Sequence, residues 1–209
     1  MTSVGRDDEY VIVDDEPLRR LSRGSVYGGA AANSIDVPPP GSPPFPWATN
    51  QVAIHHPISR LSALGITTVQ GEVQCRRCDA RRTFIYDIAS KFREVHDFVY
   101  HSIHDMDYRA PSAWTTPVLP DCDECGQRSS MRPVIPAAKE QINWIFLLLG
   151  QMLGLCTLEQ LKFFCANTRQ HRTGAKDRVL YSTYMELCNQ LCPDRLFILT
   201  VERQNRSQQ

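Results

Sequence analysis

The chain has 209 residues, of which 42% are hydrophobic and 22% are charged, a composition typical of a soluble protein with one or two domains. Lys and Arg number 23, as do Asp and Glu, so the net charge of zero does not favour a polyanionic partner for the chain as a whole. We find neither a secretory signal nor a run of about 20 apolar residues that could cross a bilayer. We therefore expect a nuclear or cytoplasmic protein, neither secreted nor membrane-bound.

Residues 1–45 are predicted to be a disordered, acidic and proline-rich tail. Acidic side chains crowd the first 16 positions, and six prolines fall between positions 38 and 46. Such a segment buries too little apolar surface to offset its conformational entropy. Within it, an apolar run followed by acids has the form of a peptide that adds a strand to a partner's sheet. This run resembles the motif that binds the small ubiquitin-like modifier and consists of Val11, Ile12, Val13, Asp14 and Asp15.

Residues 46–136 are predicted to form a zinc-ribbon-like β module with an inserted helix. Residues 58–64 suit a short helical turn, and the β-rich runs 66–69 and 72–74 are separated by Gly71. Residues 83–86 are expected to return as a strand. The apolar period then changes, with residues at three- or four-residue spacing that predict an amphipathic helix over 88–106. The residues with this spacing are Ile88, Phe92, Val95, Val99 and Ile103. A proline-rich loop over 111–120 and a short strand over 131–135 complete the module.

Residues 137–195 are predicted to be a three-helix region of the same domain, followed by a C-terminal tail over 196–209. Lys139 to Leu155 is apolar nearly all round, as expected for one central core helix. Thr157 and Gln160 have the spacing of a capping box and start the second helix. The third helix is expected over 175–191 and should bury Leu180, Tyr184, Leu187, Cys188 and Leu191. The predicted fold class is therefore α+β, a zinc-ribbon-like β module packed on a C-terminal helical region.

Four of the eight cysteines form two C-x-x-C pairs, Cys75 with Cys78 and Cys122 with Cys125. In a reducing compartment, this spacing favours metal binding over disulfides, and four thiolates complete the tetrahedral shell of a structural Zn²⁺. The 43 residues between the pairs exceed a minimal ribbon loop, and the predicted inserted helix accounts for the excess. The alternatives are two unrelated pairs, or a redox dithiol, which needs only one pair. The other cysteines are expected to be buried as small hydrophobes, namely Cys156, Cys165, Cys188 and Cys192.

Arginines cluster in and beside the first cysteine pair, at Arg76, Arg77, Arg81 and Arg82. Four thiolates around Zn²⁺ carry a net charge of −2, which these side chains would offset. They could also contact an acidic partner or nucleic acid, and the two roles are compatible.

A second basic stretch runs over 169–178, at the expected start of the third helix. Its free N–H groups and cations would suit a phosphate or another polyanion. The alternative is internal pairing with Glu159 or Asp177. The candidate anion- or nucleic-acid-binding residues of this stretch are Arg169, His171, Arg172, Lys176 and Arg178.

Several runs over roughly residues 46–193 resemble a plant-type family of uncharacterised proteins, known only as a domain of unknown function. The runs begin at Pro46-Trp47-Ala48-Thr49-Asn50, at Gly71-Glu72-Val73-Gln74-Cys75, at Arg109-Ala110-Pro111-Ser112, at Asn143-Trp144-Ile145-Phe146 and at His171-Arg172-Thr173-Gly174. The resemblance implies a plant source and one continuous domain, and it implies no activity.

The leading functional prediction is a zinc-binding interaction module that binds or scaffolds another protein of unknown identity. The second hypothesis is a nucleic-acid-binding regulatory protein, which would use the arginine-rich cysteine turn and the 169–178 stretch. An enzyme of unknown class is the third, because four thiolates leave no open metal position for catalysis.

Overall fold

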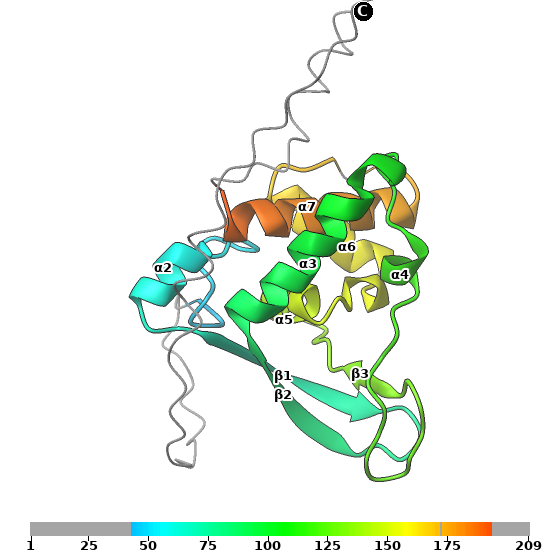
Figure 1. The fold of residues 1–209 in the computed structure, drawn as a ribbon. Coiled ribbons are helices and arrows are strands. Elements are labelled where there is room, and N and C mark those ends of the chain that lie inside the picture. The colour runs from blue at the N-terminus through cyan, green and yellow to red at the C-terminus, as the bar shows by residue number, and fades with distance from the viewer. Residues whose placement is uncertain (1–42, 172, 194–209) are drawn as a thin grey trace, which may run out of the picture. The chain divides into compact units, whose positions relative to one another are not determined.

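The computed structural model describes residues 43–171 and 173–193, all of which belong to one compact unit. Within these ranges no helix is both long and apolar enough to span a bilayer. A small sheet lies on one side of the unit and the helices gather on the other (Figure 1). The strands are β1 (Thr68–Cys75), β2 (Arg81–Asp87) and β3 (Met131–Pro133). The α-helices are α2 (Ile58–Ala63), α3 (Ile88–Ser102), α4 (Ser112–Thr115), α5 (Trp144–Leu149), α6 (Leu158–Asn167) and α7 (Lys176–Leu191).

The sheet is antiparallel, in the order β2-β1-β3. β1 runs without interruption through Gly71, so the two separate β runs expected from the sequence are one strand. The glycine is needed for packing and does not end the strand. A Cβ added to Gly71 would lie 2.5 Å from the ring of Phe146, which stacks on Tyr86 of β2 with ring centroids 5.1 Å apart.

Helix α3 follows the predicted amphipathic pattern. Asp87 caps its first turn by accepting a hydrogen bond from the backbone N–H of Ser90 at 2.8 Å. Its buried residues are Ile88, Phe92, Val95 and Val99, as the apolar spacing predicts. A single 3₁₀ turn, Ile103–Asp105, ends the inserted segment. The loop expected over 111–120 contains one further helical turn, α4, whose Trp114 is fully buried.

The prediction of one central helix over Lys139–Leu155 is wrong, because this segment forms three short helical elements. A 3₁₀ turn, Lys139–Gln141, precedes α5, and another, Leu153–Leu155, follows it. Asn143 starts α5 by accepting a hydrogen bond from the backbone N–H of Phe146, and Gln151 leaves the helical conformation with φ of 53°. All six residues of α5 are buried, so the apolar run reflects burial on every side and not helix length.

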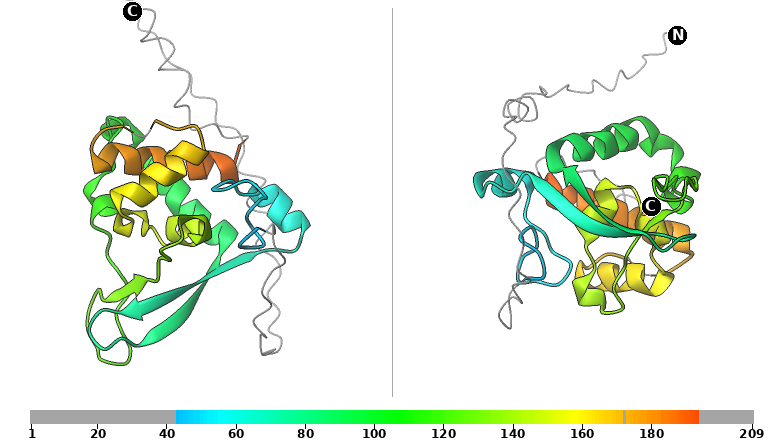
Figure 2. Two further views of the ribbon diagram at one scale, coloured as in Figure 1. Left: turned by 180° about the vertical axis from the view of Figure 1, so that it is seen from behind. Right: turned by 90° about the horizontal axis from the view of Figure 1, so that it is seen from below.

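Helices α6 and α7 pack against each other, and α5 contacts β1, α3 and α7. Figure 2 shows α7 and α6 on the side of the unit away from the β1–β2 hairpin. The capping box predicted at Thr157 and Gln160 is present, with both reciprocal hydrogen bonds. α7 buries every residue predicted for it, and Trp114 stacks on Tyr184 with ring centroids 3.8 Å apart. The C-terminal region is therefore helical as expected, with one of its three helices much shorter.

Candidate metal centre

The four cysteines of the two C-x-x-C pairs meet at one end of the sheet. Their sulfur atoms all lie within 4.8 Å of one another, although 43 residues separate the pairs in sequence. Cys75 ends β1 and Cys78 lies in the turn to β2, whereas Cys122 and Cys125 come from the loop before β3. The convergence of the four residues agrees with the sequence prediction.

The two cysteine turns have the same backbone hydrogen bonds. In the first turn the N–H of Cys75 donates to the carbonyl of Ala80, and the N–H of Asp79 donates back to Cys75. In the second turn the N–H of Cys122 donates to the carbonyl of Gln127, and the N–H of Gly126 donates to the carbonyl of Cys122. The fifth residue of each turn has positive φ, 59° at Asp79 and 67° at Gly126. Two segments of unrelated sequence thus adopt one turn, and each presents two sulfurs to the same point.

The sulfur spacing suits a tetrahedral ion. Cys75 Sγ lies 3.7 Å from Cys125 Sγ, and Cys78 Sγ lies 3.7 Å from Cys122 Sγ. Four sulfurs each about 2.3 Å from a central Zn²⁺ would be separated by about 3.8 Å, whereas a disulfide requires about 2.05 Å. Both short distances join one turn to the other, so an ion here would bind the two turns to each other. This cluster can therefore hold a metal ion.

Ser130 is a member of the site that the cysteine pattern does not reveal. It is fully buried, its Oγ lies 3.4 Å from Cys75 Sγ, and its hydroxyl also donates to the carbonyl of Gln127 at 2.8 Å. Its backbone carbonyl accepts from the N–H of Arg76 at 3.1 Å, which ties the second turn to the first. The one sequence signal for Ser130 is its place between Cys125 and the strand that begins at Met131.

The thiols do not ionise independently. The Ser130 hydroxyl, followed by backbone N–H groups, lowers the pKa of Cys75 to about 6. The backbone at Ala80 favours the Cys78 thiolate, but desolvation and the neighbouring thiols outweigh this and raise the pKa of Cys78 to about 12. Four thiolates at this spacing would need a cation among them, which a bound metal ion would supply.

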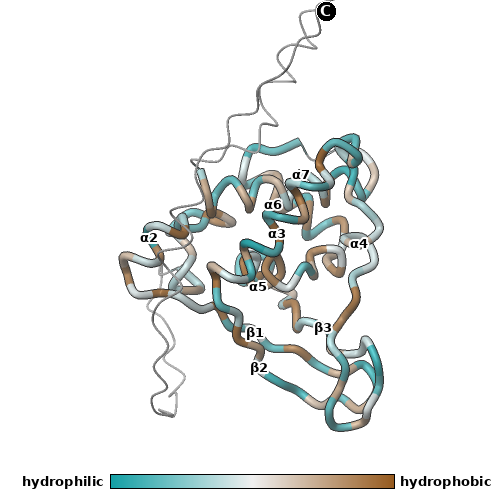
Figure 3. Tube along the Cα trace, in the orientation of Figure 1, coloured by the Kyte–Doolittle hydropathy of each residue, from teal (hydrophilic) through white to brown (hydrophobic). Residues whose placement is uncertain are grey.

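Little apolar packing supports this end of the sheet. The segment 121–130 contains no hydrophobic residue other than its two cysteines, and the first turn contains only Ala80 besides its own. Figure 3 shows hydrophilic colours over much of this tip. Cys75, Cys122, Ser130 and Met131 are the buried residues there. A metal ion would take the place of a hydrophobic core at the tip.

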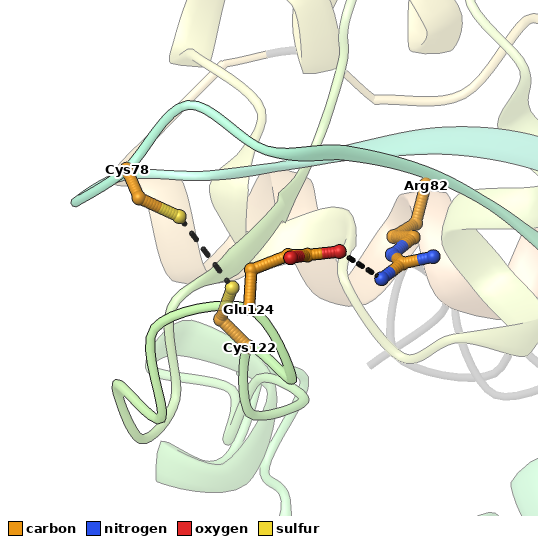
Figure 4. Close-up of polar contacts among 4 residues, drawn as sticks. All are labelled: Cys78, Arg82, Cys122 and Glu124. Carbon is orange, nitrogen blue, oxygen red and sulfur yellow. Dashed lines mark hydrogen bonds and ion pairs between the residues drawn. The ribbon is translucent and has the colours of Figure 1, made fainter.

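The arginines beside the first turn mostly contact acids or amides of the same chain. Arg82 of β2 reaches the carboxylate of Glu124 in the second turn, beside the Cys78 and Cys122 sulfurs (Figure 4). Arg81 pairs with Glu72 at 3.6 Å, and Arg77 donates to the Gln127 side chain at 3.1 Å. These exposed pairs contribute little stability singly. Binding of phosphates or of an acidic partner by the arginines stays a prediction.

The structure does not bring the 169–178 stretch to the metal centre. α7, which this stretch begins, lies away from the cysteine turns (Figures 1 and 2). The ammonium of Lys176 donates to the carbonyl of Gly154 at 2.7 Å, and Arg109 pairs with Asp177 at 2.6 Å. That hydrogen bond from Arg109 lowers the pKa of Asp177. Anion binding by the stretch stays a prediction.

The predicted site residues of the stretch separate on the structure. Arg169 and Arg178 are exposed, and the His171 ring contacts the Thr173 hydroxyl. His171, Lys176 and Asp177 have different partners. Arg172 and the apolar–acidic run 11–15 lie outside the described residues, so the modifier-binding hypothesis also stays a prediction.

The other cysteines have the environment expected of small hydrophobic residues. Cys156, Cys165 and Cys188 are fully buried, and Cys192 is half-buried. Burial raises the pKa of the Cys156 thiol to about 12, and it also raises the pKa of Cys165. Neutral thiols of this kind are poor nucleophiles and poor metal ligands.

The model of a protein family described as a domain of unknown function, DUF7086, matches residues 58–191. The match covers the metal centre and every helix from α2 to α7, whereas the Pro46–Asn50 run lies before it. Neither the curated proteins nor the solved structures include a match to the chain.

Proposed function

The chain belongs to this family of unknown function, and we propose from its site that it is a zinc-binding interaction module. The observation that carries the proposal is the meeting of two turns with the same backbone hydrogen bonds, each contributing two sulfurs at tetrahedral spacing. An all-sulfur shell favours Zn²⁺ over hard cations such as Mg²⁺ or Ca²⁺, which take oxygen ligands. Four protein ligands leave no position for water, which makes the ion structural and not catalytic.

The proposed zinc ion holds the sheet end in one shape. Cys75 and Cys78 belong to the β1–β2 hairpin, while Cys122 and Cys125 anchor the loop that leads into β3. β3 has only three residues and pairs with β1 at Val73–Cys75, immediately beside the first ligand. Since so short a strand contributes few ladder hydrogen bonds, its pairing depends on how firmly the preceding loop is fixed.

The proposed partner is another protein. A groove of about 550 Å³ lies between the β1–β3 face and the first described residues. Its lining is rich in proline and apolar side chains, including Phe45, Pro46, Pro136 and the 39% exposed Val134. Among its polar residues, Asn143 is fixed in place, since it donates to the carbonyl of Gln70 and accepts from the indole N–H of Trp47. An apolar groove with a few oriented polar groups is typical of a binding site.

Metal content tests the first half of the proposal. We expect purified full-length chain to contain one zinc ion per molecule by plasma mass spectrometry, with four sulfur neighbours at about 2.3 Å in X-ray absorption. Cys122→Ser should lose the metal, whereas Cys156→Ser, which alters a buried cysteine outside the cluster, should keep it. Folded wild-type protein that contains no metal after preparation without chelators would show that the cluster is not a zinc site.

A matched pair of pull-down experiments tests the second half. The full chain and its Val134→Lys variant would each be used as bait in cells, with and without nuclease treatment of the lysate. A protein that survives nuclease treatment and is lost with Val134→Lys supports binding at the groove. Partners that disappear on nuclease treatment would instead support the nucleic-acid reading, with Arg76 and Arg77 as the first residues to reverse in charge.

A further inference from the structure

The outer edge of β2 differs from the opposite edge of the same sheet. β3 is three residues long, ends at Pro133 and is followed by Val134, whose N–H donates to Glu72 of β1 at 2.9 Å. Short strands and prolines are means by which proteins prevent edge-to-edge pairing. β2 has seven residues in a continuous register with β1, and no proline or bulge interrupts it. In the part of the chain that the structure describes, no strand lies beyond β2 (Figure 1).

The register shows which backbone groups this edge presents. Cys75 donates to Ala80, and Ile88 donates to Thr67, so even-numbered residues of β2 make the hydrogen bonds to β1. Arg81, Thr83 and Ile85 consequently direct their N–H and C=O groups outward. The side chain of Ile85 is 62% exposed on one face of this edge. Phe84 and Tyr86, on the other face, line a pocket of about 360 Å³ together with Val118, which is 90% exposed.

We propose that β2 pairs antiparallel with β2 of a second copy of this chain, joining two three-stranded sheets into one six-stranded sheet. The sequence of β2, Arg81-Arg82-Thr83-Phe84-Ile85-Tyr86-Asp87, is self-complementary when a two-fold axis passes at Phe84. In that register Thr83 lies opposite Ile85 of the second copy, and both belong to the set whose backbone groups face outward. The backbone bonds of the two copies therefore match without any shift of register.

Side chains match in the same register. Arg81 lies opposite Asp87 of the second copy, and symmetry repeats this pair of opposite charges at the other end of the strand. Arg82, which bonds Glu124 of its own chain, lies opposite Tyr86 of the second copy, and the two Phe84 residues lie opposite each other at the centre. Opposite charges at both ends favour this register over one shifted by two residues, which would separate them. Exposed Val118, beside Phe84 in the pocket, would gain cover from the second copy.

The self-pairing depends on the edge of the sheet and not on the metal, although Thr83 also lines the groove of the proposed function. Analytical ultracentrifugation of the full chain over a wide concentration range tests it, with zinc content measured on the same samples. We expect a monomer–dimer equilibrium for the wild-type chain. Thr83→Pro should raise the dissociation constant at least about 10-fold, because symmetry removes the N–H donor at two places. The fold should persist, since that N–H takes no part in the pairing with β1.

A pair of lysine substitutions on opposite edges separates this interface from any other. Ile85→Lys should weaken the dimer as Thr83→Pro does, whereas Val134→Lys, on the β3 side, should leave it unchanged. In the dimer, hydrogen exchange measured by NMR should show protected amides at Thr83 and Ile85, with protection that increases with concentration. A wild-type chain that stays monomeric at millimolar concentration would overturn the proposal.

Two further outcomes would also contradict the self-pairing. A dimer that is unchanged by Ile85→Lys would place the interface elsewhere. Protection of Thr83 and Ile85 that is independent of concentration and lost when residues 1–42 are removed would assign the edge to the chain's own N-terminal segment. A wild-type chain that dimerises as expected but contains no zinc would refute only the metal site. The two proposals can therefore be tested independently.

Discussion

Substitution of Gly154 by alanine should be among the most destabilising single changes in the helical region. A Cβ at this position would lie 1.9 Å from the carbonyl oxygen of Trp114, about 1.5 Å short of an ordinary contact. The obstacle is backbone, because the next nearest atoms are the carbonyl carbons of Trp114 and Thr115. No side-chain rotation can therefore relieve the clash, and the 3₁₀ turn at Leu153–Leu155 must move away from α4.

The cost follows from what that movement would disturb. Trp114 is fully buried and stacks on Tyr184, and the carbonyl of Gly154 accepts the hydrogen bond from Lys176. Forcing extra volume into a close-packed core costs about 1–3 kcal/mol, and a backbone obstacle places this case at the upper end. We expect a loss of about 3 kcal/mol in the free energy of unfolding, a large fraction of a typical domain stability of about 5–15 kcal/mol.

Urea unfolding followed by tryptophan fluorescence, with zinc in excess, would measure this loss. Gly65→Ala is the matched control, because Gly65 has φ of 73° but no atom within 4 Å of an added Cβ. That variant should lose only the cost of the left-handed conformation, about 1–2 kcal/mol. If Gly154→Ala proved no less stable than Gly65→Ala, the close approach between α4 and the 3₁₀ turn would be wrong.

Four further changes test other parts of the structure. Asn143→Ala should lower the free energy of unfolding, measured in urea, by about 2–3 kcal/mol, because Asn143 caps α5 and also bonds Trp47 and Gln70. Thr157→Ala, which removes only the cap of α6, should lower it by about 1 kcal/mol. Ser130→Ala should keep the zinc but weaken its binding roughly 10- to 100-fold in competition with a chelator, since the Ser130 side chain contacts Cys75 Sγ and lowers the pKa of that thiol. Burial lowers the pKa of His55 from 6.5 to about 4, so the unfolded chain takes up a proton first as the pH falls. The stability of the wild-type chain relative to His55→Phe should therefore drop by about 3 kcal/mol between pH 6.5 and 4, and a pH-independent difference would contradict this burial.

The sequence by itself determined the features that depend on local spacing. Apolar residues three and four apart place the buried face of α3, and Thr157 with Gln160 gives the capping box of α6. The two C-x-x-C pairs identify the four cysteines that meet, because the geometry of each turn is set within six residues. The resemblance to a family known only as a domain of unknown function is confirmed by a match over residues 58–191.

Only the tertiary structure decided the features that depend on contacts between distant residues. An apolar run such as Trp144–Leu149 shows that a segment is buried but not where a side chain such as Asn143 will start a helix. Ser130 becomes part of the metal centre because β3 pairs with β1, which no local pattern encodes. The 169–178 stretch is separated from the arginines beside the first cysteine turn because α7 packs on α6, on the side away from the hairpin. Local spacing specifies elements and ligands, whereas long-range packing specifies which of them share a site.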